Sequence, residues 1–120
     1  MASRVRQNAE RRGRFAENIC MLLLRAKGYR ILQHRFRCSA GEVDIIARRG
    51  QVIAFIEVKA RQRLDRAAES IGPAQRARIM RTAEHYLARN QPAGEYSVRF
   101  DAMLVIPRRF PVHICEAWRE

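Results

Sequence analysis

Three residues near the middle of the chain have the types and the spacing of a metal-dependent hydrolytic site. Asp44 is followed by Glu57 and Lys59, so one short stretch supplies two carboxylates and one amine. Carboxylate oxygens are good ligands for Mg²⁺, which usually keeps waters and substrate phosphates in its coordination shell. The metal lowers the pKa of its bound water, and a nearby lysine orients or activates that water. The trio therefore indicates hydrolysis of phosphodiesters.

A β-hairpin is the element that must position these residues. The sequence predicts strands over 42–48 and 52–60, joined by a two-residue turn at Arg49-Gly50. With that turn, Glu42 lies directly opposite Glu57. Two like charges in directly opposed positions are destabilising, so the pair needs a cation nearby.

Side-chain alternation divides the predicted hairpin into two faces. One face is wholly apolar and is predicted to be core: Val43, Ile45, Ala47, Val52, Ala54, Ile56, Val58 and Ala60. The other face carries Glu42 and Lys59, and it brings Asp44 onto the diagonal from Glu57, within about 8 Å between backbones. A register slip of one residue would move the carboxylates to opposite faces. A solvated acidic face with a Lys59–Glu57 ion pair is the alternative, and the residues alone leave both readings open.

The remaining elements are predicted to cover this hairpin. Glycine, proline and the apolar periodicity define helices and strands over 4–27 (helix), 29–37 (strand), 73–89 (helix), 96–106 (strand) and 112–117 (strand). The order α-β-β-β-α-β-β predicts an α/β fold, with one mixed sheet flanked by helices. A chain of 120 residues has the length of one domain, so we expect a single domain over 1–120 with a basic arm over about 1–14.

The charge balance indicates an anionic partner. Lys and Arg number 24 against 12 acids, a net charge of +12, and self-repulsion of that size destabilises a folded chain. Nucleic acid is the first candidate and an acidic membrane surface the second, while an arginine-rich proteome is the alternative without a partner. Arginine, which forks onto phosphate oxygens, supplies all but two of the basic residues. The arginines expected to contact a phosphate backbone are Arg11, Arg12, Arg14, Arg61, Arg63 and Arg66.

The sequence offers little support for a disulfide-bonded, zinc-binding, membrane-spanning or secreted protein. The three cysteines are widely spaced without a CxxC motif, which is typical of reduced thiols in the cytoplasm, and the histidines do not complete a zinc-ligand spacing. The longest apolar run, 19–24, is far shorter than the roughly 20 residues that span a bilayer. No signal-peptide pattern is visible. We therefore expect a cytoplasmic protein without a membrane partner.

Two stretches resemble the core of the PD-(D/E)XK nuclease superfamily: Gly41-Glu42-Val43-Asp44-Ile45-Ile46-Ala47 and Ile56-Glu57-Val58-Lys59-Ala60-Arg61. The chain more closely resembles the small bacterial YraN family, which is described as endonuclease-like and is similar to archaeal Holliday-junction resolvases. The likeness runs from Gly13-Arg14-Phe15-Ala16-Glu17 to Pro107 and Ala117-Trp118. It implies a restriction-endonuclease-like fold.

The resemblance also implies roles for individual residues. Asp44, Glu57 and the backbone carbonyl of Val58 would hold Mg²⁺ or Mn²⁺, Lys59 would be the catalytic lysine, and Glu17 of the first helix would complete the site. An ordinary exposed helix glutamate is the alternative for Glu17.

Three further residues are candidates for supporting the site: Glu42, Gln75 and Asp101. Gln75 matches a position where relatives place a polar residue facing the site, although the family more often carries lysine there. A solvated helix residue is the alternative for Gln75. A structural salt bridge is the alternative for Asp101.

The leading hypothesis is a metal-dependent endonuclease acting on DNA, including branched or otherwise structured DNA. Phosphate contacts would dominate its affinity and make binding salt-dependent, and no base-reading motif is visible, so shape is the expected target. The first alternative is a nucleic-acid-binding module on a nuclease-like fold without turnover. The second is an adaptor whose basic surface docks an acidic protein. A homodimer is compatible with the resemblance, since cutting both strands of a junction needs two sites.

Overall fold

The computed structural model of the chain describes residues 2–62 and 71–119, with side chains from residue 13 onward in these ranges. Its helices and strands are α1 (Ala2–Ala26), β1 (Arg30–Cys38), β2 (Gly41–Arg49), β3 (Val52–Ala60), α3 (Pro73–Asn90), β4 (Ser97–Val105) and β5 (Val112–Trp118). The predicted order α-β-β-β-α-β-β is confirmed, and each boundary lies within two residues of its predicted place.

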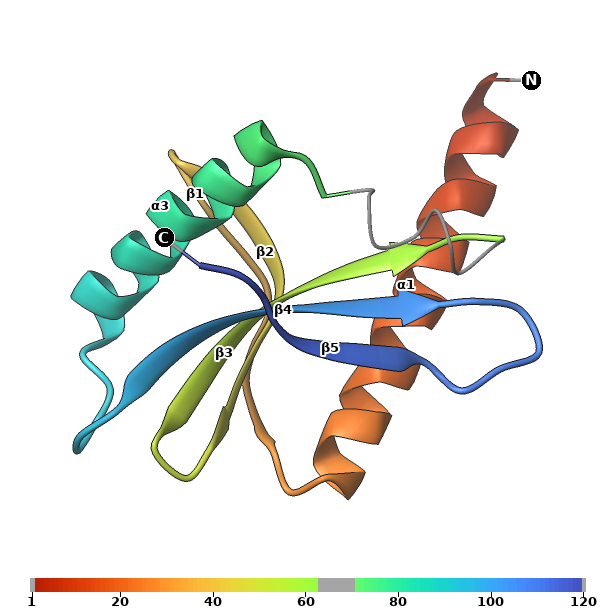
Figure 1. Cartoon of the computed structure of the whole chain (residues 1–120). Coiled ribbons are helices and arrows are strands. Elements are labelled where there is room, and N and C mark those ends of the chain that lie inside the picture. The colour runs from red at the N-terminus through yellow and green to blue at the C-terminus, as the bar shows by residue number, and fades with distance from the viewer. Residues whose placement is uncertain (1, 63–70, 120) are drawn as a thin grey trace.

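The five strands form one mixed sheet in the order β1-β2-β3-β4-β5. Neighbouring strands are antiparallel except β3 and β4, which are parallel. A parallel pair needs a long crossover, and the connection through α3 provides it. Figure 1 shows the strands fanning between α1 on one side and α3 on the other. The predicted mixed sheet flanked by helices is therefore confirmed.

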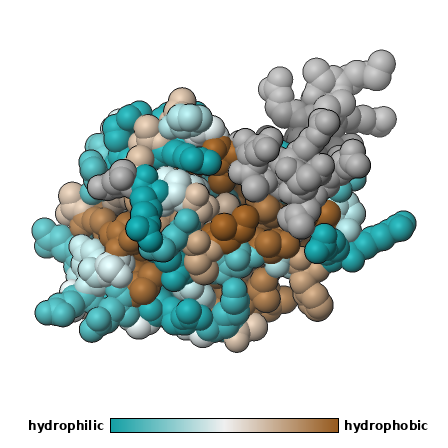
Figure 2. Space-filling view, in the orientation of Figure 1, coloured by the Kyte–Doolittle hydropathy of each residue, from teal (hydrophilic) through white to brown (hydrophobic). Residues whose placement is uncertain are grey.

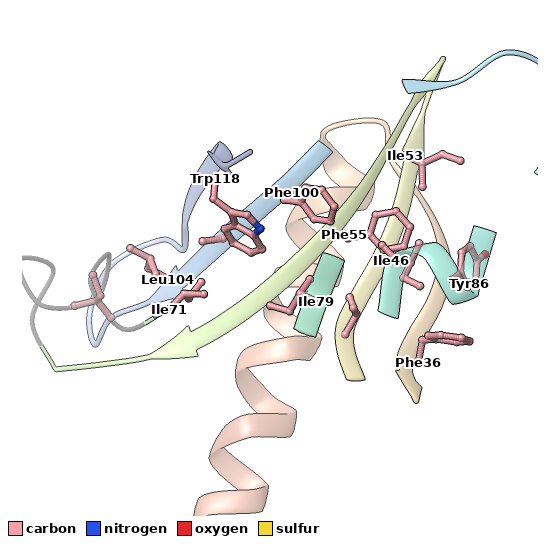
Figure 3. Packing of buried hydrophobic residues seen from close by; sticks show 14 residues of the cluster. Phe36, Ile46, Ile53, Phe55, Ile71, Ile79, Tyr86, Phe100, Leu104 and Trp118 are labelled. Atoms are coloured by element: carbon pink, nitrogen blue, oxygen red, sulfur yellow. The ribbon is translucent and has the colours of Figure 1, made fainter. Parts of the chain in front are cut away.

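Each face of the sheet buries its own apolar cluster. On the α3 side, Ile79 and Tyr86 pack against a cluster that includes Ile46, Phe55 and Phe100 (Figure 3). On the α1 side, the buried members of the cluster are Cys20, Met21, Leu24, Tyr29, Ile45, Ala47, Ala54, Ile56 and Met103. Because both faces are covered, the central strands are apolar on both sides, as expected for a sheet between two helical layers.

One apolar stripe of α1 faces the sheet and another does not. Ala16, Cys20 and Leu24 recur every four residues and are buried, as the helical repeat requires. Phe15 and Leu22 lie on the outward side of the same helix and are 65% and 68% exposed. Figure 2 shows that hydrophobic residues (brown) interrupt the hydrophilic surface across the middle of the visible face. Among the described residues, no helix combines the length and the apolar character needed to cross a bilayer.

The β2–β3 turn is one residue further along the chain than predicted. Gly50 and Gln51 form the turn, and Arg49 pairs with Val52. Gly50 has a φ of +60° at the first central position, a conformation that tight hairpin turns place on glycine. The predicted turn at Arg49-Gly50 is therefore wrong, and the pairing of Glu42 with Glu57 that it implied is wrong with it.

A close approach of α3 fixes the entry to β2. Gly41 has a φ of +147°, and a Cβ built on it would lie 3.1 Å from the Thr82 hydroxyl oxygen. Thr82 is fully buried, and its hydroxyl donates to the Arg78 carbonyl at 2.8 Å. Glycine is needed here for both its backbone conformation and its missing side chain.

Candidate active site

The candidate site lies where β2 and β3 separate. Their ladder runs from the turn to the pair Ile45–Ile56 and ends there, although both strands continue. Beyond that pair, β2 stays paired with β1 as far as Gly41, and β3 stays paired with β4 as far as Ala60. We call this separation the fork. Asp44 and Glu57 are the first residues past the last pair, one on each arm of the fork.

Asp44 occupies the opening of the fork with its side chain. Its Oδ2 accepts a hydrogen bond from the backbone N–H of Val58 at 2.8 Å, in place of a ladder carbonyl. The paired N–H and C=O of one residue in an antiparallel strand point toward the same neighbour, so the Val58 carbonyl is directed into the same opening. The structure thus brings the side chain of Asp44 and the backbone of Val58 together, as the resemblance implied.

Side-chain alternation in β2 breaks at Asp44, which the sequence prediction did not anticipate. Val43 packs in the cluster under α3, whereas Ile45 packs in the cluster under α1. Across the strand, Arg35 of β1 has a φ of +57°, and the β1–β2 pairing passes over Arg35 and Asp44. The predicted apolar face that joined Val43 to Ile45 is therefore wrong at Val43.

Glu57 is contacted by Lys59 and Gln75. The Glu57 Oε1 atom lies 3.8 Å from the Lys59 Nζ and accepts a hydrogen bond from Gln75 Nε2 at 3.2 Å. Lys59 is two residues along the same strand, so strand alternation puts both side chains on one side. Gln75 comes from the first turn of α3, which begins at Pro73 after the N-cap residue Gly72. The Lys59–Glu57 ion pair of the alternative reading is present, although Glu57 is buried rather than solvated.

The two carboxyl groups of the fork both have raised pKa values, chiefly because they are shielded from water. Burial is the main cause that raises the pKa of Glu57 to about 9, and the adjacent Asp44 carboxyl adds to it. Burial also raises the pKa of Asp44, although the hydrogen bonds from Glu57 and the Val58 N–H oppose that rise. Without a cation, the site therefore holds a proton that two exposed carboxylates would have lost.

Glu17 reaches the β1 side of the site from α1. Its carboxylate is 6% exposed and is gripped by Arg35, which donates from Nε at 3.1 Å and from a terminal nitrogen at 3.0 Å. His34 Nε2 lies 2.9 Å from the same carboxylate. Glu17 and Asp44 both line a cavity of about 220 Å³, with Glu42 and three arginines: Arg14, Arg35 and Arg37.

The donor set at the fork suits a hard divalent cation. Asp44 and Glu57 offer carboxylate oxygens and Val58 offers a carbonyl, which are the ligand types of Mg²⁺ and Mn²⁺. Burial is the main cause that raises both pKa values, with repulsion from neighbouring carboxylates added to it, and a cation would favour the ionised form of both groups. Within the described part of the chain, neither Glu17 nor Glu42 joins this pair in a group whose ligand atoms all lie within 4.8 Å of one another. The fork itself therefore supplies two carboxylates, and waters would complete the shell.

Asp101 lies in a separate network on β4. It is fully buried, accepts from Arg99 at 2.8 Å on each oxygen, and also contacts His113 Nε2 at 2.8 Å and the Glu116 N–H at 3.1 Å. His113, Asp101 and Cys115 are close enough to share an ion. However, Arg99 and Lys27 already bind the carboxylate and the imidazole, respectively, so two cations compete with a metal there. The salt bridge named as the alternative for Asp101 is present.

The remaining predicted residues lie at the edge of the site or outside the described part of the chain. Glu42 is exposed and pairs with Arg37 at 2.9 Å. The Arg61 guanidinium is exposed and donates to the Ala60 carbonyl at 2.8 Å. Arg63 and Arg66 lie outside the described residues, as do the side chains of Arg11 and Arg12.

The family of this chain follows from its sequence. Residues 16–105, which include both arms of the fork, match the model of the uncharacterised protein family UPF0102. The chain belongs to this family. The predicted membership of the YraN family is thereby confirmed, since UPF0102 is that family.

Other UPF0102 proteins match nearly the whole chain. A UPF0102 protein of Paramagnetospirillum magneticum is 50% identical and covers 98% of this chain and 94% of its own length. A UPF0102 protein of Maricaulis maris is 49% identical, covering 97% of this chain and 91% of its own. One from Parvibaculum lavamentivorans is 46% identical over 92% of this chain and 84% of its own.

Sequence reasoning about this UPF0102 chain missed the residues that hold Glu17. Arg35 and His34 are in the predicted strand before the hairpin, where an arginine or a histidine has no distinctive spacing. The feature that identifies them is the backbone of Arg35, whose φ of +57° turns both side chains toward α1. A positive φ at a residue other than glycine is uncommon and is not readable from the residue type.

Proposed function

We propose that this chain is a metal-dependent endonuclease that hydrolyses phosphodiester bonds of DNA at the fork, with branched or structured DNA as the substrate. The observation that carries the proposal is the placement of two carboxylates, the half-buried Asp44 and the buried Glu57, on the two arms of the fork beside Lys59. Both carboxyl pKa values are raised, as expected for groups arranged to share a cation.

Asp44, Glu57 and the carbonyl of Val58 would hold Mg²⁺ or Mn²⁺. The bound ion supplies a water of lowered pKa and neutralises charge on the phosphate. Asp44 keeps its Oδ2 fixed through the Val58 N–H, so one ligand is preorganised. Gln75 holds Oε1 of Glu57 from the opposite helix and thus sets the orientation of the second carboxylate.

Lys59 is suited to orient the attacking water. Its side chain is 18% exposed, so solvent reaches it, and its Nζ lies 3.8 Å from Glu57 Oε1. Lysine presents a compact charge with rotatable donors, whereas arginine presents a fixed fork. The chain has only two lysines among its 24 basic residues, and one of them, Lys59, lies beside the candidate metal ligand Glu57.

The cavity on the α1 side is suited to the scissile phosphate. It is lined by three carboxylates, Asp44, Glu17 and Glu42, and by three arginines, Arg14, Arg35 and Arg37. Arg35 pairs with Glu17 and Arg37 with Glu42, so a phosphate bound there would share these guanidinium groups with the two glutamates. Arginine binds phosphate oxygens in a bidentate manner, and the net charge of +12 attracts a polyanion over a longer range. Binding is therefore expected to weaken steeply with salt.

The test is cleavage of supercoiled, linear and four-way-junction DNA in the presence of Mg²⁺ or Mn²⁺. Asp44→Asn, Glu57→Gln and Lys59→Met should each lower the rate by about a hundredfold or more, the scale of losing a charge-stabilising or proton-handling group. Glu84→Gln is the matched control, because Glu84 is an exposed acid of α3 nine residues beyond Gln75. Cleavage by Asp44→Asn and Glu57→Gln at the wild-type rate would refute the proposal.

Binding without cleavage would point to the other candidate, a nucleic-acid-binding module without turnover. That reading predicts salt-sensitive DNA binding by all four variants and no metal-dependent product with any of the three DNAs. An adaptor for an acidic protein predicts no salt-sensitive DNA binding at all. The same set of purified variants therefore separates the three functions.

A further inference from the structure

A large apolar groove lies next to the candidate site. It has a volume of about 900 Å³, near the upper end of the roughly 300–1,000 Å³ that is typical of ligand pockets. Its walls come from α1, from the end of β3 and from the β4–β5 loop. The apolar part of the lining includes Phe15, Ile19, Val105, Ile106, Pro107 and Phe110.

The groove and the candidate site both border α1. Arg14 and Glu17 line the cavity of about 220 Å³ that Asp44 also lines, while Phe15 and Ala16, their neighbours on the same helix, line the groove. Ala60 brings the end of β3 into the groove, although strand alternation places the side chain of Lys59 on the other face of that strand. A nucleic-acid strand whose phosphate occupies the cavity beside Asp44 would therefore extend along α1 into this groove.

Two phenylalanines that line the groove are largely exposed to solvent. Phe110, on the β4–β5 loop, is 88% exposed, and Phe15, on α1, is 65% exposed. Phenylalanine has no polar end to place in water, and its exposure sacrifices the free energy of burying a large apolar surface. Flat aromatic side chains around a groove are the usual platforms on which unpaired bases stack.

The charged lining of the groove selects an anion. Arg61, Arg108 and Arg109 line it, and no acidic side chain is present among the described residues of the lining. Aromatic faces and arginines together match a nucleic-acid strand, whose bases stack while its phosphates pair with guanidinium groups. A purely apolar protein segment would leave these three charges without a counterpart. An anionic membrane would favour aromatics that project from a convex surface, whereas these line a hollow.

We propose that this groove binds unpaired nucleobases of a strand whose adjacent phosphodiester lies at the fork. The inference rests on the proposed function for its ligand class, and it narrows the substrate to DNA with a single-stranded segment next to the cut. Fully paired DNA leaves the groove empty, because stacked and paired bases cannot reach Phe15 and Phe110.

The test measures binding without cleavage, with EDTA present and fluorescence anisotropy as the readout. Two labelled duplexes carry the same single-stranded extension, one with normal bases and one with abasic sites, so the phosphate charge is identical. The wild-type protein should bind the extension with bases about tenfold more tightly, a preference within the range of one base–aromatic stack. Phe15→Ala and Phe110→Ala should each reduce that preference several-fold while leaving the affinity for the abasic duplex unchanged.

Leu22→Ala is the matched control, because Leu22 is an equally exposed apolar residue of α1 that does not line the groove. It should retain the preference, and 2-aminopurine in the extension should lose fluorescence on binding to wild type but not to the phenylalanine variants. All three substituted side chains are exposed, so folding is expected to persist and is checked by circular dichroism.

Equal binding of the two duplexes by the wild-type protein would overturn the inference, as would a preference that both phenylalanine variants keep. Loss of a homodimer, or of binding to anionic vesicles, in these variants without any change in base preference would overturn it as well. Asp44→Asn should keep the preference. A preference that depends on the two phenylalanines, found in a protein that cleaves no DNA, would support the groove while the proposed hydrolysis fails.

Discussion

The Asp44 carboxylate accepts a hydrogen bond from the backbone N–H of Val58 at 2.8 Å, across the point where β2 and β3 part. An aspartate side chain thereby takes the place of a strand carbonyl. It also stands next to Glu57, whose carboxyl proton it helps to retain. Asp44 therefore satisfies a backbone N–H beyond the end of the ladder and also adds a carboxylate beside Glu57. Several measurable consequences arise from this arrangement.

The metal-free protein should become less stable as the pH rises. The pKa of Glu57 is raised from 4.5 to about 9, chiefly by burial, so above the lower value the unfolded chain ionises while the folded chain keeps its proton. By linkage, stability falls across this window and levels off above it. Glu57→Gln removes that loss and should be more stable than wild type near neutral pH by on the order of 1 kcal/mol or more, since one pKa unit corresponds to about 1.4 kcal/mol.

Urea denaturation of both proteins in EDTA, from acid to alkaline pH, measures this gap. The difference should be small near the unfolded pKa of 4.5 and should widen toward about 9. Glu84→Gln removes the charge of an exposed residue of α3, and its stability should depend on pH in the same way as that of the wild type. A gap that stays constant with pH would contradict the assignment of the effect to Glu57.

Divalent metal should reverse this pH trend. Mg²⁺ or Mn²⁺ needs both carboxylates ionised, so binding releases a proton and strengthens as the pH rises. We expect the Tm increase produced by a fixed concentration of Mn²⁺ to grow between about pH 6 and about pH 9, through stabilisation of the native state by mass action. Asp44→Asn and Glu57→Gln should lose most of the increase. The same increase in these variants would place the metal elsewhere.

Arg35 should tolerate glycine better than alanine. Its φ of +57° is strained for any residue with a Cβ, and its guanidinium holds the buried Glu17 carboxylate. Both substitutions break that ion pair, at a cost of about 1–3 kcal/mol because Arg35 is partly open to solvent. Only alanine keeps the backbone strain, so Arg35→Gly should be more stable than Arg35→Ala by about 1 kcal/mol.

Arg37→Ala is the matched control for that comparison. Arg37 lies two residues after Arg35 on β1 and forms an ion pair with Glu42. The side chains of Arg37 and Glu42 are 70% and 60% exposed. Exposed pairs contribute little, so Arg37→Ala should change the free energy of unfolding by about 0.5 kcal/mol or less. Chemical denaturation at neutral pH orders the three variants, and an Arg35→Gly variant less stable than Arg35→Ala would count against the strained backbone.

Asp101→Asn should destabilise the protein at neutral pH and much less in acid. Burial alone would raise the Asp101 pKa, but the hydrogen bonds from His113 and Arg99 outweigh it and lower the pKa below 3.8. The stability contributed by such a carboxylate is present above the unfolded pKa and is lost as the pH falls through the folded one. Breaking a buried pair costs about 3–5 kcal/mol, so we expect a deficit of that order at neutral pH.

Denaturation curves of wild type and Asp101→Asn at neutral pH and below the unfolded pKa of 3.8 check this expectation. Glu116→Gln provides the control, because its exposed carboxylate pairs only with the exposed Arg119 among the contacts described, while its backbone N–H still donates to Asp101. A loss of stability in Asp101→Asn that is equally large at neutral and at acid pH would show that packing, not charge, underlies its effect.

The sequence predicted the elements well because their signals are local. Pro73 after Gly72 marked the start of α3, and apolar alternation marked β3 with its observed limits. The pairing of Glu57 with Lys59 was also predictable, since residue type and strand spacing suffice to bring these two side chains to one side. Register was not, because moving the turn by one residue changes every partner by two while keeping the facing pattern.

What the sequence could not predict depends on tertiary contacts. The break in alternation at Asp44 lies across from the left-handed backbone of Arg35, where the β1–β2 pairing passes over both residues. The network of Asp101 joins Lys27, which follows α1, to residues of β4 and β5, and no local pattern connects them. In both places an aspartate side chain, half-buried for Asp44 and fully buried for Asp101, accepts from a backbone N–H where a strand ladder is interrupted.

The parting of β2 and β3 also determines where this sheet can yield. Hydrogen bonds secure the hairpin from its turn to Ile45 and Ile56, and beyond that pair each strand is anchored to a different outer neighbour. Movement of the paired ends 36–38 of β1 and 41–43 of β2, relative to β3 and β4, would change the gap between Asp44 and Glu57 without breaking a backbone ladder. The hydrogen bond from the Val58 N–H to Asp44 is the contact that resists such movement, so the spacing of the two carboxylates depends on that one bond, with Ile45 and Ile56 as the pivot.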